Sequence, residues 1–209
     1  MMRTFIMVRH GQSETNVKKA FTGQIDAPLT DTGREQAWRM AAYVNRYKVD
    51  KIYVSPLQRA VETAEAIAVT QNCPVERQDA LMEINAGFWQ GLTFDEVSRR
   101  YPQTHGAWKS NFDTAAPDGG ETCQQVYERV TEFFRDVIHH TQEETVCFVA
   151  HAIPIRMMEK YMLNIPAQEI SWVPNASVTV YTYDGAFRAV VRGCCDFLGD
   201  LKSSLPKNI

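Results

Sequence analysis

Apolar and polar positions along the chain alternate between strand-like and helix-like segments. Nearly continuous apolar or β-favouring runs at residues 4–8, 51–54 and 145–150 are typical of strands that a sheet buries on both faces. Residues 73–76 indicate a weaker strand. These four segments are far apart in the chain, so a sheet built from them needs a connecting element between each pair of strands.

The segments between the strands carry the spacing of amphipathic helices. After Asp31, for example, apolar residues recur at i, i+3, i+4 and i+7, and Thr30 or Asp31 can cap this helix. Proline suits the first turn of a helix, where its missing N–H needs no partner. The predicted helices run from Asp31, from Ser55-Pro56 to about Val69, from the capping box at residues 93–96 to Pro102, over residues 121–140, and from Pro154 to about Leu163.

Alternating strands and helices favour an α/β fold. The expected architecture is a three-layer sandwich, in which helices cover both faces of a mostly parallel sheet. Two β-favouring runs around Asp184-Gly185 predict a hairpin, which should add an antiparallel strand at the edge. No repeat, low-complexity tract or linker divides residues 1–209, so a single domain is expected. In such sheets, ligands bind beyond the carboxyl ends of the strands.

Composition narrows the classes of partner and the cellular compartment. The sequence has 25 acidic against 22 basic residues and a net charge of −3, which gives no reason to expect nucleic acid or an anionic membrane surface. No apolar run approaches the about 18 residues of a membrane span, and no signal peptide precedes the first strand. Five irregularly spaced cysteines predict reduced thiols and a cytoplasmic protein.

Basic residues follow the predicted strands at the edge where a ligand is expected. Arg9 and His10 end the first strand, Arg59 lies one turn into the helix after the second, and His151 follows the central run. Such a cluster repels itself unless an anion lies within it, and two guanidinium groups suit a phosphate because each can donate two parallel hydrogen bonds. The sequence therefore predicts a phosphate site that needs no metal ion to neutralise its ligand.

Two roles are open for a histidine beside a bound phosphate. It can only donate hydrogen bonds, or a neutral ring nitrogen can attack phosphorus and split a difficult hydrolysis into two easier steps. The departing alcohol then needs a proton, which Glu83 can supply from its place after the presumed third strand. By position alone, Glu96 or Asp79 could serve instead. The five histidines show no metal-ligand spacing.

Four segments in a fixed order carry a resemblance to a known family. VRHGQSETN, SPLQRAVETA, LMEINAGFWQG and VAHAIPIR, within about Thr4 to Met158, resemble the histidine phosphatase superfamily in its phosphoglycerate-mutase-like branch. The resemblance implies that His10 is the phosphorylated nucleophile and Glu83 the proton donor, with no cofactor. It implies a phosphate or substrate pocket formed by Arg9, Asn16, Thr22, Gly23, Arg59, His151 and Ala152. The family commonly has glycine at the position of Ala152, so the local geometry there is a departure.

The same pocket can serve a phosphatase, in which water attacks the phosphohistidine, or a mutase, in which a second hydroxyl does. The stretch after Glu83 has the short W-x-G form of the phosphatases in this family, so a phosphomonoesterase is expected. A phosphoglycerate-type phosphomutase and a catalytically inactive module that binds phosphorylated ligands are the alternatives. A small phosphate ester is favoured over a phosphoprotein as the substrate. Neither the identity of the ester nor the oligomeric state is predicted.

A lid that selects the substrate is expected over about residues 87–118. Two kinds of leaving group are compatible with the residue types in and near this segment. A second anionic group could meet Lys18, Lys19, Arg99, Arg100 or Lys109, each of which is otherwise a solvated surface charge. An apolar ester could instead meet Phe21, Phe88, Trp89, Trp108 or Phe112.

Overall fold

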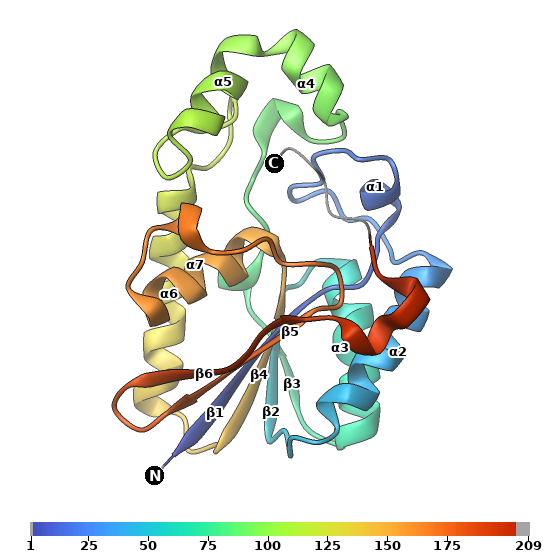
Figure 1. Ribbon diagram of the computed structural model, residues 1–209, viewed down its shortest axis with the longest axis vertical. Helices are drawn as coiled ribbons and strands as arrows, with labels where there is room; N and C mark the ends of the chain where they lie inside the picture. The colour runs from blue at the N-terminus through green and yellow to red at the C-terminus, as the bar shows by residue number, and fades with distance from the viewer. Residues whose placement is uncertain (1, 204–209) are drawn as a thin grey trace.

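A computed structural model describes residues 2–203 of the chain and places their strands in one sheet (Figure 1). The strands are β1 Arg3–Arg9, β2 Lys51–Val54, β3 Val75–Arg77, β4 Thr145–Ala150, β5 Val178–Tyr183 and β6 Phe187–Cys194. They lie in the order β3-β2-β4-β1-β5-β6. The first four are parallel, whereas β5 and β6 form the expected hairpin and pair antiparallel with β1 and with each other. The predicted mostly parallel sheet with an antiparallel edge is confirmed.

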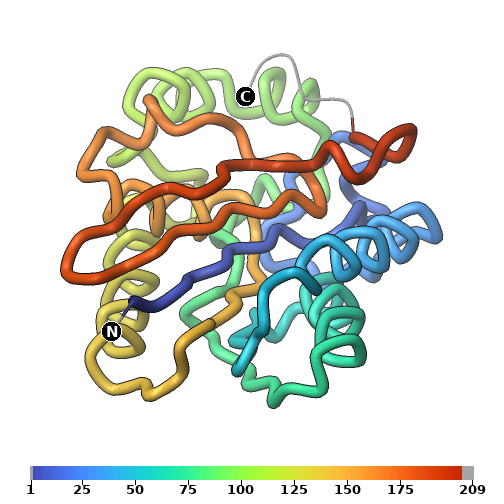
Figure 2. Tube along the Cα trace, turned by 60° about the horizontal axis from the view of Figure 1, so that its bottom comes forward, coloured from blue at the N-terminus to red at the C-terminus, as the bar shows by residue number. Residues whose placement is uncertain are grey.

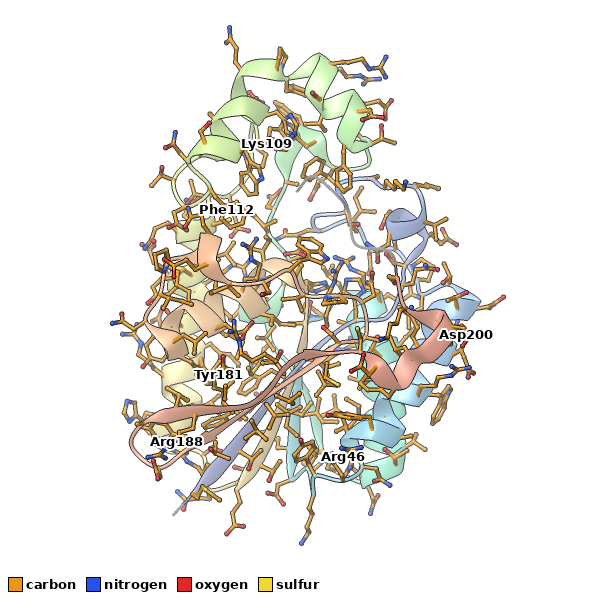
Figure 3. All side chains as sticks on the ribbon, in the orientation of Figure 1. Arg46, Lys109, Phe112, Tyr181, Arg188 and Asp200 are labelled. Carbon is orange, nitrogen blue, oxygen red and sulfur yellow. The ribbon has the colours of Figure 1, made fainter. Side chains whose placement is uncertain are left out.

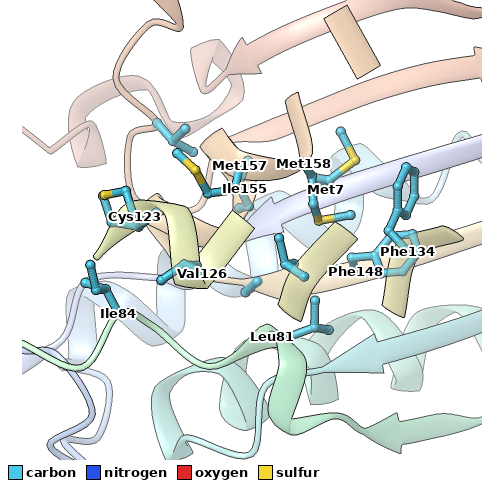
Figure 4. Close-up of a cluster of buried hydrophobic side chains, with 14 of the residues drawn as sticks. Met7, Leu81, Ile84, Cys123, Val126, Phe134, Phe148, Ile155, Met157 and Met158 are labelled. Atoms are coloured by element: carbon cyan, nitrogen blue, oxygen red, sulfur yellow. The ribbon is translucent and has the colours of Figure 1, made fainter. Parts of the chain in front are cut away.

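Helices cover both faces of this sheet. They are α2 Asp31–Val44, α3 Gln58–Gln71, α6 Cys123–His140 and α7 Ala152–Leu163. Successive strand residues point to opposite faces, so Ile6 and Val8 pack in one core with α2 and α3, while Phe5 and Met7 pack in another with α6 and α7. Figure 2 shows α2 and α3 on one side of the strands and α6 on the other, and Figure 4 shows the second core. The three-layer α/β class is thereby confirmed.

Several elements begin at residues other than the predicted ones. Helix α3 begins at Gln58 and not at Ser55-Pro56, because the Ser55 hydroxyl contacts His151 Nε2 at 2.8 Å and does not cap the helix. Helix α7 begins two residues before Pro154, whose missing N–H is tolerated in the first turn. Strand β3 and helix α6 each begin two residues later than expected. None of these shifts moves an element to another place in the sheet order.

Two short helices, α4 (Phe94–Arg100) and α5 (Pro102–Ser110), lie beyond the carboxyl ends of the parallel strands (Figure 1). The expected capping box opens α4 through hydrogen bonds between Thr93 and Glu96. Pro102 ends α4 but also opens α5, a helix that was not predicted. Around these helices Trp89, Tyr101, His105, Trp108 and Phe112 pack edge-on or tilted against one another. The segment therefore has an aromatic core of its own.

The chain enters and leaves this segment through a closed neck. Phe88 N donates to Asp118 O at 2.9 Å, and Glu121 N donates to Asn85 O at 2.8 Å. Gly87 has φ +51°, and a Cβ at this position would stand 2.2 Å from Asp118 O, so the close approach requires glycine. These bonds set the borders of the segment close to residues 87 and 118. Its action as a lid stays a prediction.

A buried carboxylate ties α7 to the hairpin. Glu159 is 3% exposed, and its Oε1 accepts hydrogen bonds from the Tyr181 hydroxyl at 2.9 Å and from Arg192 Nε at 2.7 Å. Tyr181 is labelled in Figure 3. Replacing Glu159 by alanine should lower the free energy of unfolding by about 1–3 kcal/mol, because the buried hydroxyl loses its partner. Urea unfolding measures this change.

The matched control for that experiment is Glu128→Ala, at an exposed position of α6. It should stay within about 0.5 kcal/mol of the parent protein, as surface substitutions usually do. A Glu159→Ala protein as stable as the control would contradict the role given to this carboxylate.

Candidate active site

The register of the parallel strands brings distant residues to one edge. Arg9 at the end of β1 pairs with Ala150 of β4, and Val54 at the end of β2 pairs with Val149. The residues that follow these strand ends, His10, Ser55 and His151, therefore emerge side by side. The His10 and His151 rings lie 5.0 Å apart between centroids. The convergence expected from the sequence is present.

His10 is held in one tautomer. Its Nδ1 lies 2.6 Å from the Gly11 carbonyl oxygen, which can only accept, so Nδ1 carries the proton and Nε2 keeps its lone pair. The side chain is 3% exposed. Burial, reinforced by the charges of Arg59 and Arg9, lowers the pKa of His10 well below its usual value. The ring is therefore neutral near pH 7 and presents a nucleophilic nitrogen.

Two buried guanidinium groups flank the histidines. Arg59 donates from Nη1 to Ile25 O and from Nη2 to Gly23 O, both at 2.8 Å. Arg9 donates to Val173 O and lies over the Trp172 ring at 5.1 Å. Burial lowers the pKa of each arginine to about 10, which leaves both charged at neutral pH.

Both arginines keep a donor for an anion. Among residues 2–203, Arg9 Nε and Arg59 Nε have no hydrogen-bond partner although both atoms are buried. A buried donor without an acceptor is costly, and phosphoryl oxygens are acceptors of the required kind and charge. The donor set therefore fits a phosphate group.

His151 is fully buried at the start of α7. Leu57 N donates to Ser55 Oγ at 3.4 Å, and Ser55 Oγ lies 2.8 Å from His151 Nε2, so this ring nitrogen is already paired within the protein. Nδ1 has no partner among residues 2–203, so it is the ring nitrogen left for a ligand. Burial and the charge of Arg59 lower the pKa of His151 well below its usual value. His151 is therefore neutral beside His10.

Glu83 lies on the loop after the short helix at residues 79–81. Its Oε1 accepts hydrogen bonds from Ile84 N at 2.9 Å and from Ile153 N of α7 at 3.3 Å, which brings the carboxyl beside His151. Desolvation raises the pKa of Glu83, and it outweighs the Ile84 N–H and the charges of Arg59 and Arg9, which lower it. The raised pKa favours a protonated carboxyl that can act as an acid.

The two alternatives to Glu83 differ from it in environment. The Glu96 carboxylate accepts hydrogen bonds from Thr93 N and Thr93 Oγ1 at the N-cap of α4, and these bonds lower the pKa of Glu96. Asp79 opens the short helix before Glu83, and within residues 2–203 its side chain makes no hydrogen bond or ion pair with the histidines or arginines of the site. Of the three carboxyl groups considered, Glu83 is the one with contacts to α7.

Comparison with known proteins identifies the family. Residues 5–195 match the family described as the histidine phosphatase superfamily (branch 1). The chain belongs to this superfamily. The resemblance carried by the four sequence segments is thereby confirmed.

Relatives within the superfamily carry different activities in their names. Phosphoserine phosphatase 1 of Hydrogenobacter thermophilus is 35% identical over 164 residues, which is 78% of each chain. A 2,3-bisphosphoglycerate-dependent phosphoglycerate mutase of Cytophaga hutchinsonii is 32% identical over 188 residues and 88% of each chain. The solved structure of a mycobacterial glucosyl-3-phosphoglycerate phosphatase with VO3 superposes with a TM-score of 0.85 at 28% identity, over 92% of this chain and 100% of that one.

Three further residues expected in the histidine phosphatase pocket, Asn16, Thr22 and Gly23, lie in the segment between β1 and α2. Asn16 Oδ1 accepts from Ser13 N at 3.0 Å, so its Nδ2 is the atom left for a ligand. Thr22 Oγ1 lies 2.7 Å from Thr15 Oγ1. Gly23 has φ +51°, and a Cβ there would stand 2.2 Å from Gln90 Oε1. These contacts fix the two loops that follow β1.

Ala152, the departure from the family pattern, lies in the first turn of α7 and is 3% exposed. Because this position is helical, its φ is negative and suits alanine as well as glycine. The substitution therefore leaves the local backbone as the helix requires.

The residues proposed for substrate selection do not gather in the same way. The candidates for a second anion, Lys18, Lys19, Arg99, Arg100 and Lys109, are all exposed, and Arg100 pairs with Glu96 at 3.4 Å. Phe112 lies against α7, where the Arg156 guanidinium is 4.7 Å from the centre of its ring, and Figure 3 labels Lys109 above Phe112. Trp89 and Trp108 are 0% and 6% exposed, so they pack inside the lid segment. No described contact links these basic residues to the histidines.

A fifth segment at the site was missed by the sequence analysis. Residues 172–177 precede β5, which is antiparallel to β1, so the amino end of β5 lies at the carboxyl end of β1. Ser177 O accepts from Arg9 N at 3.2 Å, and Ala176 N donates to His10 O at 3.0 Å. Applying the strand-end rule to the start of an antiparallel neighbour would have found these residues.

Proposed function

We propose that the protein is a phosphomonoesterase that forms a covalent phosphohistidine on His10. The observation that carries this proposal is the neutral His10 ring, held through Nδ1 with Nε2 free, between two buried guanidinium groups. Membership of a superfamily whose relatives include phosphatases supports the reaction class. Small phosphate esters are the proposed substrates.

In the first step, His10 Nε2 forms a bond to phosphorus while the bond from phosphorus to the alcohol oxygen breaks. Arg9, Arg59 and the Nδ1–H of His151 hold the phosphoryl oxygens and stabilise the charge that spreads over them. Glu83, kept protonated by its raised pKa, gives its proton to the departing alcohol oxygen. The products of this step are phosphohistidine, a neutral alcohol and an ionised Glu83.

In the second step, a water oxygen attacks phosphorus and the bond to Nε2 breaks. Glu83 takes the water proton, so phosphate leaves while the neutral His10 and the protonated Glu83 are restored. The guanidinium groups supply the positive charge that a metal ion supplies in other phosphatases. Among residues 2–203, no group of three or more His, Cys, Asp or Glu side chains is placed to hold a metal ion. We therefore propose metal-independent hydrolysis.

A phosphomutase is the second candidate, because relatives at similar identity carry both names. The sequence after Glu83 favours the phosphatase, since the stretch between this residue and α4 has the short W-x-G form. An inactive binding module is disfavoured because the nucleophile, both arginines, the second histidine and the acid are all present at one site.

None of the helices in residues 2–203 combines the length and the apolar character that a membrane crossing requires. All five cysteines are free thiols. The cytoplasmic location inferred from them stays a prediction.

A panel of esters in the presence of EDTA tests the proposal. The panel holds an aryl phosphate, phosphoserine, 3-phosphoglycerate and a phosphopeptide, with released phosphate and phosphoglycerate isomers measured in parallel. Phosphate release from at least one small ester is the expected result. Isomer exchange without release would favour the mutase, release from the peptide alone would favour a phosphoprotein substrate, and inactivity toward every compound would favour a binding module.

The loop that carries Glu83 is clamped by Arg129 of α6. Arg129 Nη1 donates to Ala80 O at 2.7 Å, and Nη2 donates to Glu83 O at 3.2 Å. Its Nε pairs with Glu121 at 3.1 Å, and Glu121 in turn accepts from Asn85 N at 2.7 Å. Both sides of the Glu83 loop are therefore tied to one guanidinium group.

Replacing Arg129 by glutamine should reduce kcat on alkyl phosphates by roughly 10- to 100-fold, because a small displacement of Glu83 misaligns the proton transfer. Steady-state kinetics with an alkyl ester measures the change. Arg135→Gln is the control, since this residue of α6 is exposed and, among residues 2–203, its side chain hydrogen-bonds only to Thr131 O of the same helix. Equal rates for the two variants would argue against the clamp.

A further inference from the structure

The strongest unassigned feature near the site is the turn at residues 174–177. Ser177 N donates to Pro174 O at 3.2 Å, which closes the turn, and Ala176 N donates to His10 O at 3.0 Å. Ala176 has φ +52°, a conformation that residues with a Cβ rarely adopt, and it is fully buried. Unfavourable backbone geometry of this kind persists where the surrounding contacts require it, often at functional sites.

Asn175 points its amide from this turn at three oxygens. Its Nδ2 lies 3.0 Å from Asn16 Oδ1, 3.2 Å from His10 O and 3.4 Å from Gly11 O. The residue is 6% exposed. All three neighbours are acceptors in this arrangement, so the nitrogen and not the oxygen of the amide must face them.

Two of these acceptors bear directly on phosphoryl transfer. Gly11 O is also the acceptor for His10 Nδ1–H at 2.6 Å, the bond that leaves Nε2 free. Asn16 Oδ1 also accepts from Ser13 N, and with Asn175 on the same oxygen the Asn16 amide is fixed with its nitrogen free. Without the Asn175 amide, the Gly11 carbonyl and the Asn16 side chain would both lose the hydrogen-bond donor that they share.

We propose that Asn175 is a positioning residue, which holds the Gly11 carbonyl as the partner of His10 Nδ1–H and orients Asn16 so that its amide nitrogen can donate to a phosphoryl oxygen. This inference rests on the proposed function for its catalytic consequence. The geometric part, control of the His10 tautomer, does not depend on any substrate.

Two variants and two readouts test the proposal. Asn175→Leu keeps the branched shape without a donor, and Asn175→Ala removes the side chain. Nitrogen-15 NMR of the histidine rings reports which nitrogen of His10 carries the proton, and kinetics on an aryl phosphate report kcat and KM. Asn45→Ala is the control, because Asn45 is an exposed asparagine that follows α2 and precedes the amino end of β2.

Both Asn175 variants should fold, show a larger fraction of His10 with the proton on Nε2, and lose about 10²-fold in kcat. In an Asn16→Ala background the same substitution should cost less, because part of the effect acts through Asn16. Asn45→Ala should match the parent protein in both readouts. A wild-type tautomer in both folded Asn175 variants would overturn the proposal, as would unchanged kcat.

Failure of the proposed function has a different signature. In that case the parent protein releases no phosphate from any ester, while the NMR comparison still decides whether Asn175 sets the tautomer. If Asn175→Leu does not fold, the folded Asn175→Ala protein decides by the same two readouts. Activity lost only in proportion to unfolded protein, with the remaining folded protein unchanged, would show a purely structural residue and refute the positioning role.

Discussion

Replacing His10 by alanine is expected to reduce phosphate release by about 10⁴- to 10⁶-fold, because removal of a nucleophile leaves only the residual effect of substrate binding. The fold should survive, since His10 lies at the edge of the sheet beyond β1. Initial rates with an aryl phosphate, measured alongside the circular dichroism of the same sample, check both parts of the expectation.

His139→Ala is the control for this experiment. His139 is exposed in the last turn of α6, just before the amino end of β4, whereas the site lies at the carboxyl ends of the parallel strands. It should keep the parent rate. A purified His10→Ala protein that turns over ester at the rate of the control would exclude His10 as the nucleophile.

Replacing Glu83 by glutamine should have the second largest effect, and the effect should depend on the leaving group. An alkyl alcohol needs the proton that Glu83 supplies, so kcat on alkyl phosphates should fall by about 10²–10⁴-fold. An aryl alcohol leaves with less assistance, so the loss on aryl phosphates should be much smaller. Glu128→Gln, an exposed position of α6, serves as the control. Equal losses on both classes of ester would remove the acid role from Glu83.

The same carboxyl sets the expected pH dependence. Burial raises the pKa of Glu83, so the acid stays protonated to higher pH than a solvated glutamate does, and the rate should fall as pH rises through this raised pKa. Burial and the two arginines lower the pKa of His10, so the nucleophile stays neutral to lower pH. On the acid side, the rate should decrease as pH falls through this lowered pKa and His10 becomes protonated. In Glu83→Gln the fall at high pH should disappear.

The sheet was predictable because most of its parallel strands have a local sequence pattern that is typical of buried strands. The runs at residues 4–8, 51–54 and 145–150 are nearly continuous in apolar or β-favouring residues, as is typical of strands buried on both faces, and each became a strand within a residue or two. Helix starts were less predictable where the expected capping side chain makes a contact elsewhere in the fold. Serine is a common N-cap residue, yet the Ser55 hydroxyl hydrogen-bonds to His151, which lies 96 positions away in the chain.

The candidate site was predictable for the same reason in its parallel part only. Arg9, His10 and His151 follow parallel strands, so the strand-end rule gathers them from sequence alone. Asn175 precedes an antiparallel strand, and its three acceptors are main-chain and side-chain oxygens of another segment. The same rule reaches Asn175 only when it is also applied to the start of the antiparallel strand β5, because these contacts form when β5 pairs with β1.

Substrate preference was not predictable from residue types. The exposed lysines and arginines near the lid resemble an anion site in composition, but they lie at the surface. A solvent-exposed charge contributes little interaction energy there. The aromatic residues of the same segment mostly pack against each other. The panel of esters is therefore the means of assigning the leaving group.

Trapping the phosphorylated protein tests the central claim most directly. The protein is mixed with a ³²P-labelled ester, quenched in alkali, which preserves phosphohistidine, and digested for mass spectrometry. The expected result is one acid-labile phosphoryl group on the peptide that contains His10, absent in His10→Ala. Label on another residue, or phosphate release by the parent protein with no labelled histidine at any time of quenching, would contradict the mechanism.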